Sequence, residues 1–306
     1  MPLLPQLVSP EELRDALGDE RVRVFDATVF LRRAADGGPY AVESGRESYA
    51  RAHIRGAGFA DIPGALSDPA SPFAFTLPAA EHFAAAIGRL GIGDSTHVVA
   101  YAQDTPMWAT RLWWLLRYFG HDDTSVLDGG LVAWTAADGP VESGESTFPP
   151  ASFTAHPRPE LLASLADVRE ITENGSACLV NALSPAAFRG EGPGAYSRPG
   201  RIPGSVNVPW NGLVDAATNR FRPPAELRPV RTAARRTLPV VQHRYLSHVT
   251  LPGSVCTRIK RNWGLSGLTR KCKRTISISS RVLSATCENI PKKCRRGLLR
   301  WIPLFR

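Results

Sequence analysis

Hydrophobic residues in the first 230 positions fall into short runs separated by amphipathic stretches. The runs 22–27, 97–101 and 177–182 each hold at least four apolar side chains, which is typical of strands buried on both faces. The stretch 108–119 instead repeats large apolar side chains at helical spacing. Buried strands that alternate with amphipathic helices predict an α/β fold, with a mostly parallel sheet flanked by helices.

Signals for helix ends support this interpretation. Ser9 precedes a predicted helix that opens with Pro10, and Glu12 stands three residues after the serine. This is the arrangement of a capping box with proline in the first turn. Gly120 directly follows the stretch 108–119 and predicts the end of that helix, because glycine readily adopts the left-handed conformation found there.

The chain contains two copies of one unit. A shift of 155 positions superposes Ser9 on Ser164, and further along a shift of 148 superposes residues 53–57 on residues 201–205. This period far exceeds the roughly 20–50 residues of solenoid repeats. The repetition therefore indicates duplicated domains.

The predicted domain boundaries follow this repeat and the composition. A first domain spans residues 5–138, and a linker rich in Gly, Ser and Pro spans residues 139–159. A second domain spans residues 160–230. It is incomplete, because the later landmarks of the first copy do not recur in residues 231–306.

The charge of the chain divides at the same point. Residues 231–306 hold 18 of the 37 Lys and Arg residues and one of the 28 acidic residues, a charge of +17 that leaves −8 for residues 1–230. Four of the five cysteines also lie beyond position 230. We interpret residues 231–306 as a non-native or disordered basic tail, produced by a shifted reading frame or another replacement of the original end.

Several classes of protein are disfavoured. No apolar run reaches the roughly 18 residues of a membrane span, and the first residues lack the pattern of a secretory signal, so we expect a cytoplasmic protein. The tail cysteines lack the close pairs of zinc sites, and no metal is expected. The basic clusters 269–274 and 291–296 leave open contact with nucleic-acid phosphates.

Five segments together resemble the rhodanese family of tandem-domain sulfurtransferases, which includes thiosulfate and 3-mercaptopyruvate sulfurtransferases. The matching segments are Phe25-Asp26-Ala27, His53-Ile54-Arg55-Gly56-Ala57, residues 111–121 with Trp113-Trp114, Val126-Leu127-Asp128-Gly129-Gly130-Leu131, and residues 201–210. The resemblance implies two rhodanese-like domains, each a parallel sheet flanked by helices. It also implies that sulfane sulfur passes from an anionic donor, through a cysteine persulfide, to cyanide or a thiol, without a cofactor.

In the family that the chain resembles, the cysteine lies in a loop after the central strand of the second domain. Backbone N–H groups and a helix N-terminus there hold the thiolate. In the first copy this position is Ala102, which carries no nucleophile. In the second copy the shift of 148 points to Thr250, and a strand at 238–241 would be followed by Gln, His and Arg. The nearest thiol, Cys256, is the remaining catalytic candidate.

The resemblance also implies arginines that bind the anionic donor. Ala187 stands where tandem members often carry such an arginine, and Arg189 and Arg198 remain as candidate donor contacts. The alternative is that both are ordinary solvated loop residues. The sequence therefore predicts a sulfurtransferase family member whose activity is impaired in this chain, and the alternative is a catalytically inactive binding or scaffold protein.

Overall fold

The computed structural model describes residues 3–32, 40–191, 199–227 and 240–243. These residues form two compact units. Unit 1 comprises Met1–Pro159 with Val214–Phe221, and unit 2 comprises Glu160–Leu213 with the described residues from Arg222 onward. Within the described ranges, no helix is long and apolar enough to cross a membrane.

Unit 1 is built on a five-stranded sheet with the strand order β1-β8-β7-β2-β6. Every neighbouring pair in it is parallel, and the central strand β7 is buried along its whole length, as the sequence predicts. The strands are β1 (Leu7–Val8), β2 (Val22–Asp26), β6 (Gly58–Phe59), β7 (His97–Tyr101) and β8 (Thr124–Leu127).

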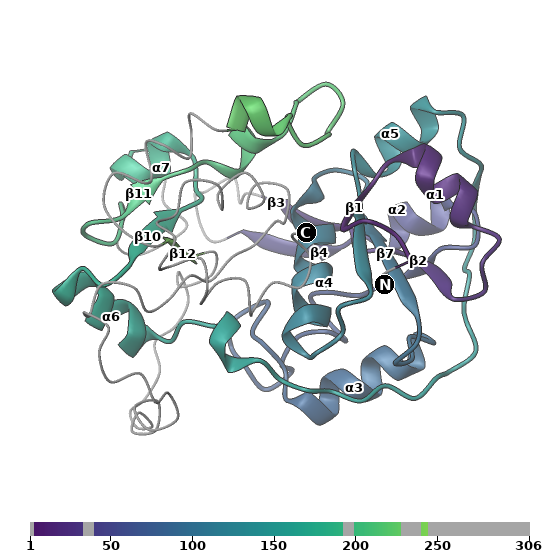
Figure 1. Ribbon diagram of the computed structural model, residues 1–306, viewed down its shortest axis with the longest axis horizontal. Coiled ribbons are helices and arrows are strands. Elements are labelled where there is room, and N and C mark those ends of the chain that lie inside the picture. The colour runs from purple at the N-terminus through teal and green to yellow at the C-terminus, as the bar shows by residue number, and fades with distance from the viewer. Residues whose placement is uncertain (1–2, 33–39, 192–198, 228–239, 244–306) are drawn as a thin grey trace, which may run out of the picture. The chain divides into compact units, whose positions relative to one another are not determined.

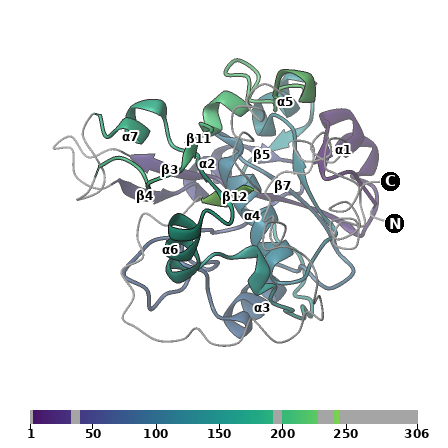
Figure 2. The same ribbon diagram turned by 60° about the vertical axis from the view of Figure 1, so that its left-hand side comes forward.

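Helices cover both faces of this sheet. Figure 1 and Figure 2 show α1 and α5 on one face and α3 and α4 on the other. The helices are α1 (Pro10–Ala16), α2 (Arg46–Arg51), α3 (Ala80–Arg89), α4 (Pro106–Tyr118) and α5 (Gly130–Ala136). The predicted start of α1 is confirmed, because the Glu12 N–H donates to Ser9 Oγ while the Ser9 N–H donates to Glu12 Oε2. The predicted α/β fold is therefore confirmed for this unit.

Two short antiparallel pairs add to unit 1. Strand β3 (Val29–Arg32) pairs with β4 (Ala41–Ser44). Strand β5 (His53–Ile54) pairs with β9 (Val141–Glu142). The second pair joins residues almost ninety positions apart, and local periodicity carries no signal for such a contact.

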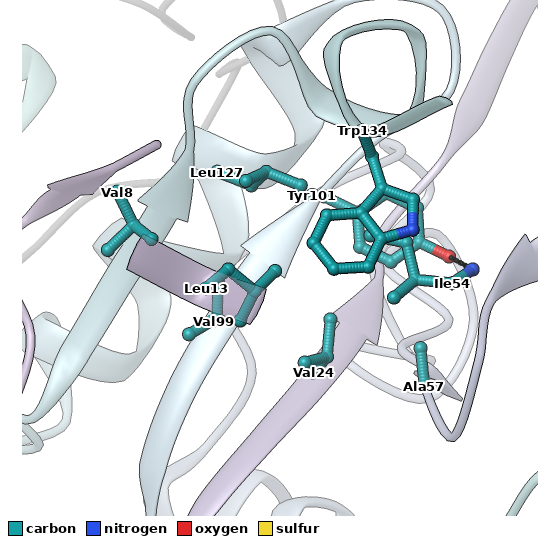
Figure 3. Close-up of a cluster of buried hydrophobic side chains, with 9 residues drawn as sticks. All are labelled: Val8, Leu13, Val24, Ile54, Ala57, Val99, Tyr101, Leu127 and Trp134. Carbon is teal, nitrogen blue, oxygen red and sulfur yellow. Dashed lines mark hydrogen bonds between the residues drawn. The ribbon is translucent and has the colours of Figure 1, made fainter. Parts of the chain in front are cut away.

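One core cluster of unit 1 lies between the sheet and the helices α1 and α5 (Figure 3). Val24, Val99 and Leu127 come from three neighbouring strands and pack with Trp134 of α5, and each is at most 3% exposed. The indole Nε1–H of Trp134 donates to the Pro140 carbonyl at 3.0 Å, so its polar atom is satisfied. Burying side chains of this size contributes about 1.5–3 kcal/mol each.

The segment 139–159, which the sequence predicts as a linker, is packed along unit 1. Phe153 is 9% exposed and lies 5.9 Å from Phe83 between ring centroids. Two backbone bonds, from His156 N–H to the Phe119 carbonyl and from Arg158 N–H to the Tyr118 carbonyl, hold its far end. The buried aromatic ring is the physical reason that a Pro- and Ser-rich stretch becomes part of the folded unit.

Unit 2 contains a parallel sheet with the strand order β11-β10-β12. Its elements are η1 (Pro159–Leu161, whose first residue belongs to unit 1), α6 (Leu165–Asn174), β10 (Cys178–Asn181), α7 (Pro185–Arg189), β11 (Val206–Asn207), η2 (Trp210–Leu213) and β12 (Val240–His243). A small apolar cluster of Val168, Ala177 and Leu179 joins α6 to β10.

The two units repeat the same geometry. Ser164 caps α6 through a capping box with Asp167, as Ser9 does for α1 with Glu12. Strand β10 pairs with β11 as β2 pairs with β6, at residues related by the shifts of 155 and 148. The duplication that the sequence indicates is thus present in the backbone.

Candidate functional site

The carboxyl edge of the unit 1 sheet is organised by the fully buried Asp26, the last residue of β2. Its Oδ1 accepts the Thr28 N–H at 2.8 Å, and its Oδ2 accepts Gln103 Nε2–H at 2.8 Å. Gln103 also donates to the Ala52 carbonyl at 3.0 Å. Burial raises the pKa of the Asp26 carboxyl, and the hydrogen bonds from Thr28 and Gln103 oppose that rise. The network ties the ends of β2 and β7 together.

Tyr101, the last residue of β7, completes this buried group. Its hydroxyl oxygen accepts the Ile54 N–H at 3.2 Å (Figure 3). Burial, with the charge of Asp26 as the next cause, raises the pKa of Tyr101 well above its ordinary value. A phenol in this state keeps its proton at neutral pH and serves as a structural group rather than a nucleophile.

The position after β7 is filled by the chain itself. Ala102 directly follows the strand, as predicted, and is 2% exposed. Its carbonyl accepts the Leu131 N–H at 3.2 Å, and a Cβ atom at Gly130 would lie 2.2 Å from the same oxygen. Because this loop is closed and its first side chain is a methyl group, it offers no sulfur-carrying atom.

The corresponding edge of unit 2 is defined by register. Asp26 pairs with Tyr101 in unit 1, and Asn181 pairs with His243 in unit 2. The residue after β12, equivalent to Ala102, is therefore Arg244. Thr250, to which the shift of 148 points, stands six positions further along and lies outside the described residues, and Arg244 is the arginine of the Gln, His and Arg that the sequence places after a strand at 238–241. Arg244 itself lies outside the described residues.

The loop that leaves β10 is held by two asparagines. Asn181 Oδ1 accepts the Leu183 N–H at 2.9 Å. Asn207 Nδ2–H donates to the carbonyls of Asn181, at 3.0 Å, and of Leu183, at 2.9 Å. Sequence reasoning did not single out Asn207 or Gln103, although a polar residue at the end of a short apolar run is the available signal for both.

Of the two arginines predicted to bind the donor, the structure describes Arg189. Arg189 ends α7 and donates from Nε and Nη2 to both carboxylate oxygens of Glu191 at 2.7 Å, and more than half of each side chain is exposed. The hydrogen bond raises the pKa of Arg189 and lowers that of Glu191. An anion that binds Arg189 must compete with this carboxylate. Arg198 lies outside the described residues.

The candidate thiol Cys256 also lies outside the described residues. The one cysteine within them is Cys178, the first residue of β10, which is 5% exposed. Burial raises the pKa of its thiol, so the reactive thiolate is disfavoured. Cys178 lines a cavity of about 110 Å³ beside the end of α6 and the turn at Gly204. It lies at the amino end of β10, opposite the edge at which a catalytic loop would follow β12.

Among the residues described, no three His, Cys, Asp or Glu side chains are grouped to hold a metal ion. The site residues that the structure brings together are hydrogen-bonding groups at the carboxyl edges of two related sheets.

Comparison with protein families matches the chain to the rhodanese-like domain over residues 9–137. The chain is similar to 3-mercaptopyruvate sulfurtransferase of Homo sapiens, with 38% identity over 204 residues, 65% of this chain and 66% of the relative. It is similar to the enzyme of that name from Escherichia coli K12, with 35% identity over 68% of this chain and 72% of the relative. Thiosulfate sulfurtransferase of Gallus gallus is 34% identical over 67% of this chain and 70% of the relative.

Solved structures agree with the sequence comparison. The crystal structure of SseA from Escherichia coli, described as a 3-mercaptopyruvate sulfotransferase with the rhodanese fold, matches with a TM-score of 0.68. It shares 30% identity over 78% of this chain and 87% of its own. Tum1 of Saccharomyces cerevisiae, with 22% identity and a TM-score of 0.64 over 76% of this chain and 79% of its own, shares the fold.

Proposed function

Because the chain belongs to the tandem-domain rhodanese-like sulfurtransferase family, we propose that it derives from an enzyme that transfers sulfane sulfur from thiosulfate or 3-mercaptopyruvate. In this chain the transfer is impaired. The similarity to sulfurtransferases across both units supports descent from such an enzyme. The strand register, by which Arg244 and not a cysteine follows β12 in the sequence, supports the impairment.

The reaction requires a thiolate at the carboxyl edge of the unit 2 sheet. The thiolate sulfur attacks the sulfane sulfur of the donor, an S–S bond forms, and sulfite leaves from thiosulfate or pyruvate enolate leaves from 3-mercaptopyruvate. Cyanide or a second thiol then attacks the outer sulfur of the persulfide and restores the thiolate. The donor is a small anion, and these two molecules and their acceptor are the proposed partners, in the cytoplasm.

The described residues do not supply this nucleophile. Ala102 follows β7 and lacks a thiol, and Cys178 is buried at the opposite end of its strand, with a thiol pKa raised by burial. Cys256 is the proposed residual nucleophile, and Arg189 and Arg198 are the proposed donor contacts. Because Arg189 is already paired with Glu191, its contribution to donor binding is expected to be small.

The alternative function is a catalytically inactive rhodanese-like binding or scaffold protein. The state of Cys178, the cysteine that the structure describes in unit 2, favours it, because this thiol is buried and burial raises its pKa. Both functions share the fold and differ in whether a persulfide forms.

Measuring the sulfur load separates these functions. The purified full chain is incubated with thiosulfate or 3-mercaptopyruvate and freed of donor, and bound sulfur is counted by intact mass and by thiocyanate released with cyanide. Escherichia coli 3-mercaptopyruvate sulfurtransferase serves as the positive control. We expect far less than one sulfur per chain, with the remaining signal lost in Cys256→Ser and kept in Cys178→Ser.

Stable, stoichiometric loading of the unaltered chain would overturn the proposed impairment. Loading that survives Cys256→Ser and disappears in Cys178→Ser would overturn the choice of Cys256. No loading in any variant, with the fold intact, identifies the scaffold alternative.

A further inference from the structure

Residues Val214–Phe221 form a hairpin that holds its own shape, and we call it the 214–221 hairpin. Its ends meet in an antiparallel bridge between Val214 and Phe221. The Asp215 N–H donates to the Arg220 carbonyl, and the Asn219 N–H donates to the Asp215 carbonyl, both at 2.8 Å. The hairpin is therefore a preformed element, which lowers the entropy lost when it binds a surface.

The 214–221 hairpin belongs to unit 1, although the residues on both sides of it belong to unit 2. Its Phe221 N–H donates to Asp128 Oδ1 at 2.8 Å. Its Asn219 Nδ2–H donates to the Asp104 carbonyl at 2.6 Å. These partners follow β8 and β7, so the hairpin lies on the carboxyl edge of the unit 1 sheet.

The fit between the hairpin and this edge is close. A Cβ atom added at Gly129 would lie 2.9 Å from the Thr218 carbonyl and from Arg220 Cγ. Gly129 also has a φ of 87°, which favours glycine for a second reason. The shape of the hairpin therefore matches this surface.

We propose that the carboxyl edge of the unit 1 sheet is a docking site for the 214–221 hairpin, with Asp128 as the residue that fixes the hairpin in place. This is the edge at which open α/β sheets bind ligands. With the hairpin docked, the edge is occupied by a segment of the chain itself and takes no sulfur donor. The proposal does not depend on whether unit 2 transfers sulfur.

Hydrogen exchange on the full chain tests this docking. In Asp128→Ala, the Phe221 amide loses a charged acceptor, and we expect its exchange to accelerate about 10- to 100-fold, the range that corresponds to a hydrogen bond to a charged group. Trypsin cleavage after Arg220 should accelerate in parallel. The matched control is Asp15→Ala, which removes an exposed carboxylate on α1 and should change neither measurement.

A second variant guards against a general loss of structure. Asn219→Gly tolerates the φ of 57° found there and removes the amide that donates to Asp104. It should also accelerate exchange in residues 218–221 and leave the amides of α4 unchanged. Exchange and cleavage that stay as in the unaltered chain in both variants would overturn the proposal, as would acceleration of α4 to the same degree as the hairpin in Asn219→Gly.

Discussion

Asp26 ends β2 of unit 1 and Asn181 ends β10 of unit 2, and the side chain of each accepts the backbone N–H of the residue two positions further along. The distances are 2.8 Å to Thr28 and 2.9 Å to Leu183. The backbone carbonyls of Asp26 and Asn181 also accept equivalent donors, the N–H groups of Ala60 and Val208. The same turn is thus preserved in both copies, with a charged residue in one and a neutral residue in the other.

The two copies differ in what closes this turn. In unit 1 the side chain of Gln103, from the loop after β7, reaches the second oxygen of Asp26. In unit 2 Asn207, from the end of β11, reaches the backbone of the turn instead. Among the described residues of unit 2, the turn is therefore stabilised from the end of β11.

The Asp26–Gln103 bond should contribute measurably to unit 1. Gln103→Ala leaves a buried carboxylate oxygen without this donor, and we expect a loss of roughly 2 kcal/mol in the free energy of unfolding. Urea unfolding followed by tryptophan fluorescence measures it. Asp104→Ala, the exposed neighbour, is the control, and equal unfolding midpoints for the two variants would contradict this role.

The stability of the chain should fall in mild acid because of two buried histidines. His97 and His121 are 2% and 6% exposed, and burial lowers the pKa of each below the ordinary value of 6.5. The unfolded chain then binds protons before the folded chain does, so stability is present above pH 6.5 and is lost as the pH falls below it.

Urea midpoints at about pH 7.5 and about pH 5.5 measure this loss. The double variant His97→Gln/His121→Gln should flatten the dependence, while His82→Gln, a partly exposed residue of α3, should leave it unchanged. A double variant as sensitive to acid as the parent chain would assign the effect to other groups.

The segment 139–159 should behave as part of unit 1. Phe153→Ala removes a ring packed near Phe83 and His121, and we expect a loss of about 3 kcal/mol in the free energy of unfolding, as for other buried phenylalanines. Ser143→Ala, at an exposed position of the same segment, serves as the control. A free connection would show no loss in either variant, which would argue against the packed arrangement.

The interpretation of residues 231–306 makes a prediction at the level of DNA. If a shifted frame produced them, the DNA after codon 230 should encode a cysteine- and glycine-containing loop when it is translated in one of the other two frames. Sequencing codons 220–306 and translating all three frames checks this. The absence of such a loop in both other frames would count against a shift and favour another replacement of the end.

Much of the fold follows from local patterns in the sequence. The buried runs predicted strands β2, β7 and β10, Ser9 with Glu12 predicted the start of α1, and the two shifts predicted the repeat. The cap and the buried strands are local signals, because each depends on residues a few positions apart, whereas the repeat comes from comparing two distant segments of the sequence. The domain boundaries and the donor contacts Arg189 and Arg198 remain predictions.

The sequence by itself determined that this chain is a duplicated α/β protein and that the repeat is lost in its basic end. Both the charge and the repeat can be read along the sequence without knowledge of three-dimensional contacts. Only the tertiary structure decided which residue of the second copy pairs as Tyr101 does in the first, since strand register counts residues through pairing rather than through a fixed shift. The hydrogen bonds between Gln103 and Asp26 and between Phe221 and Asp128 were also visible only in the tertiary structure. These partners are 77 and 93 positions apart, and such contacts form only when folded strands bring distant loops to one edge.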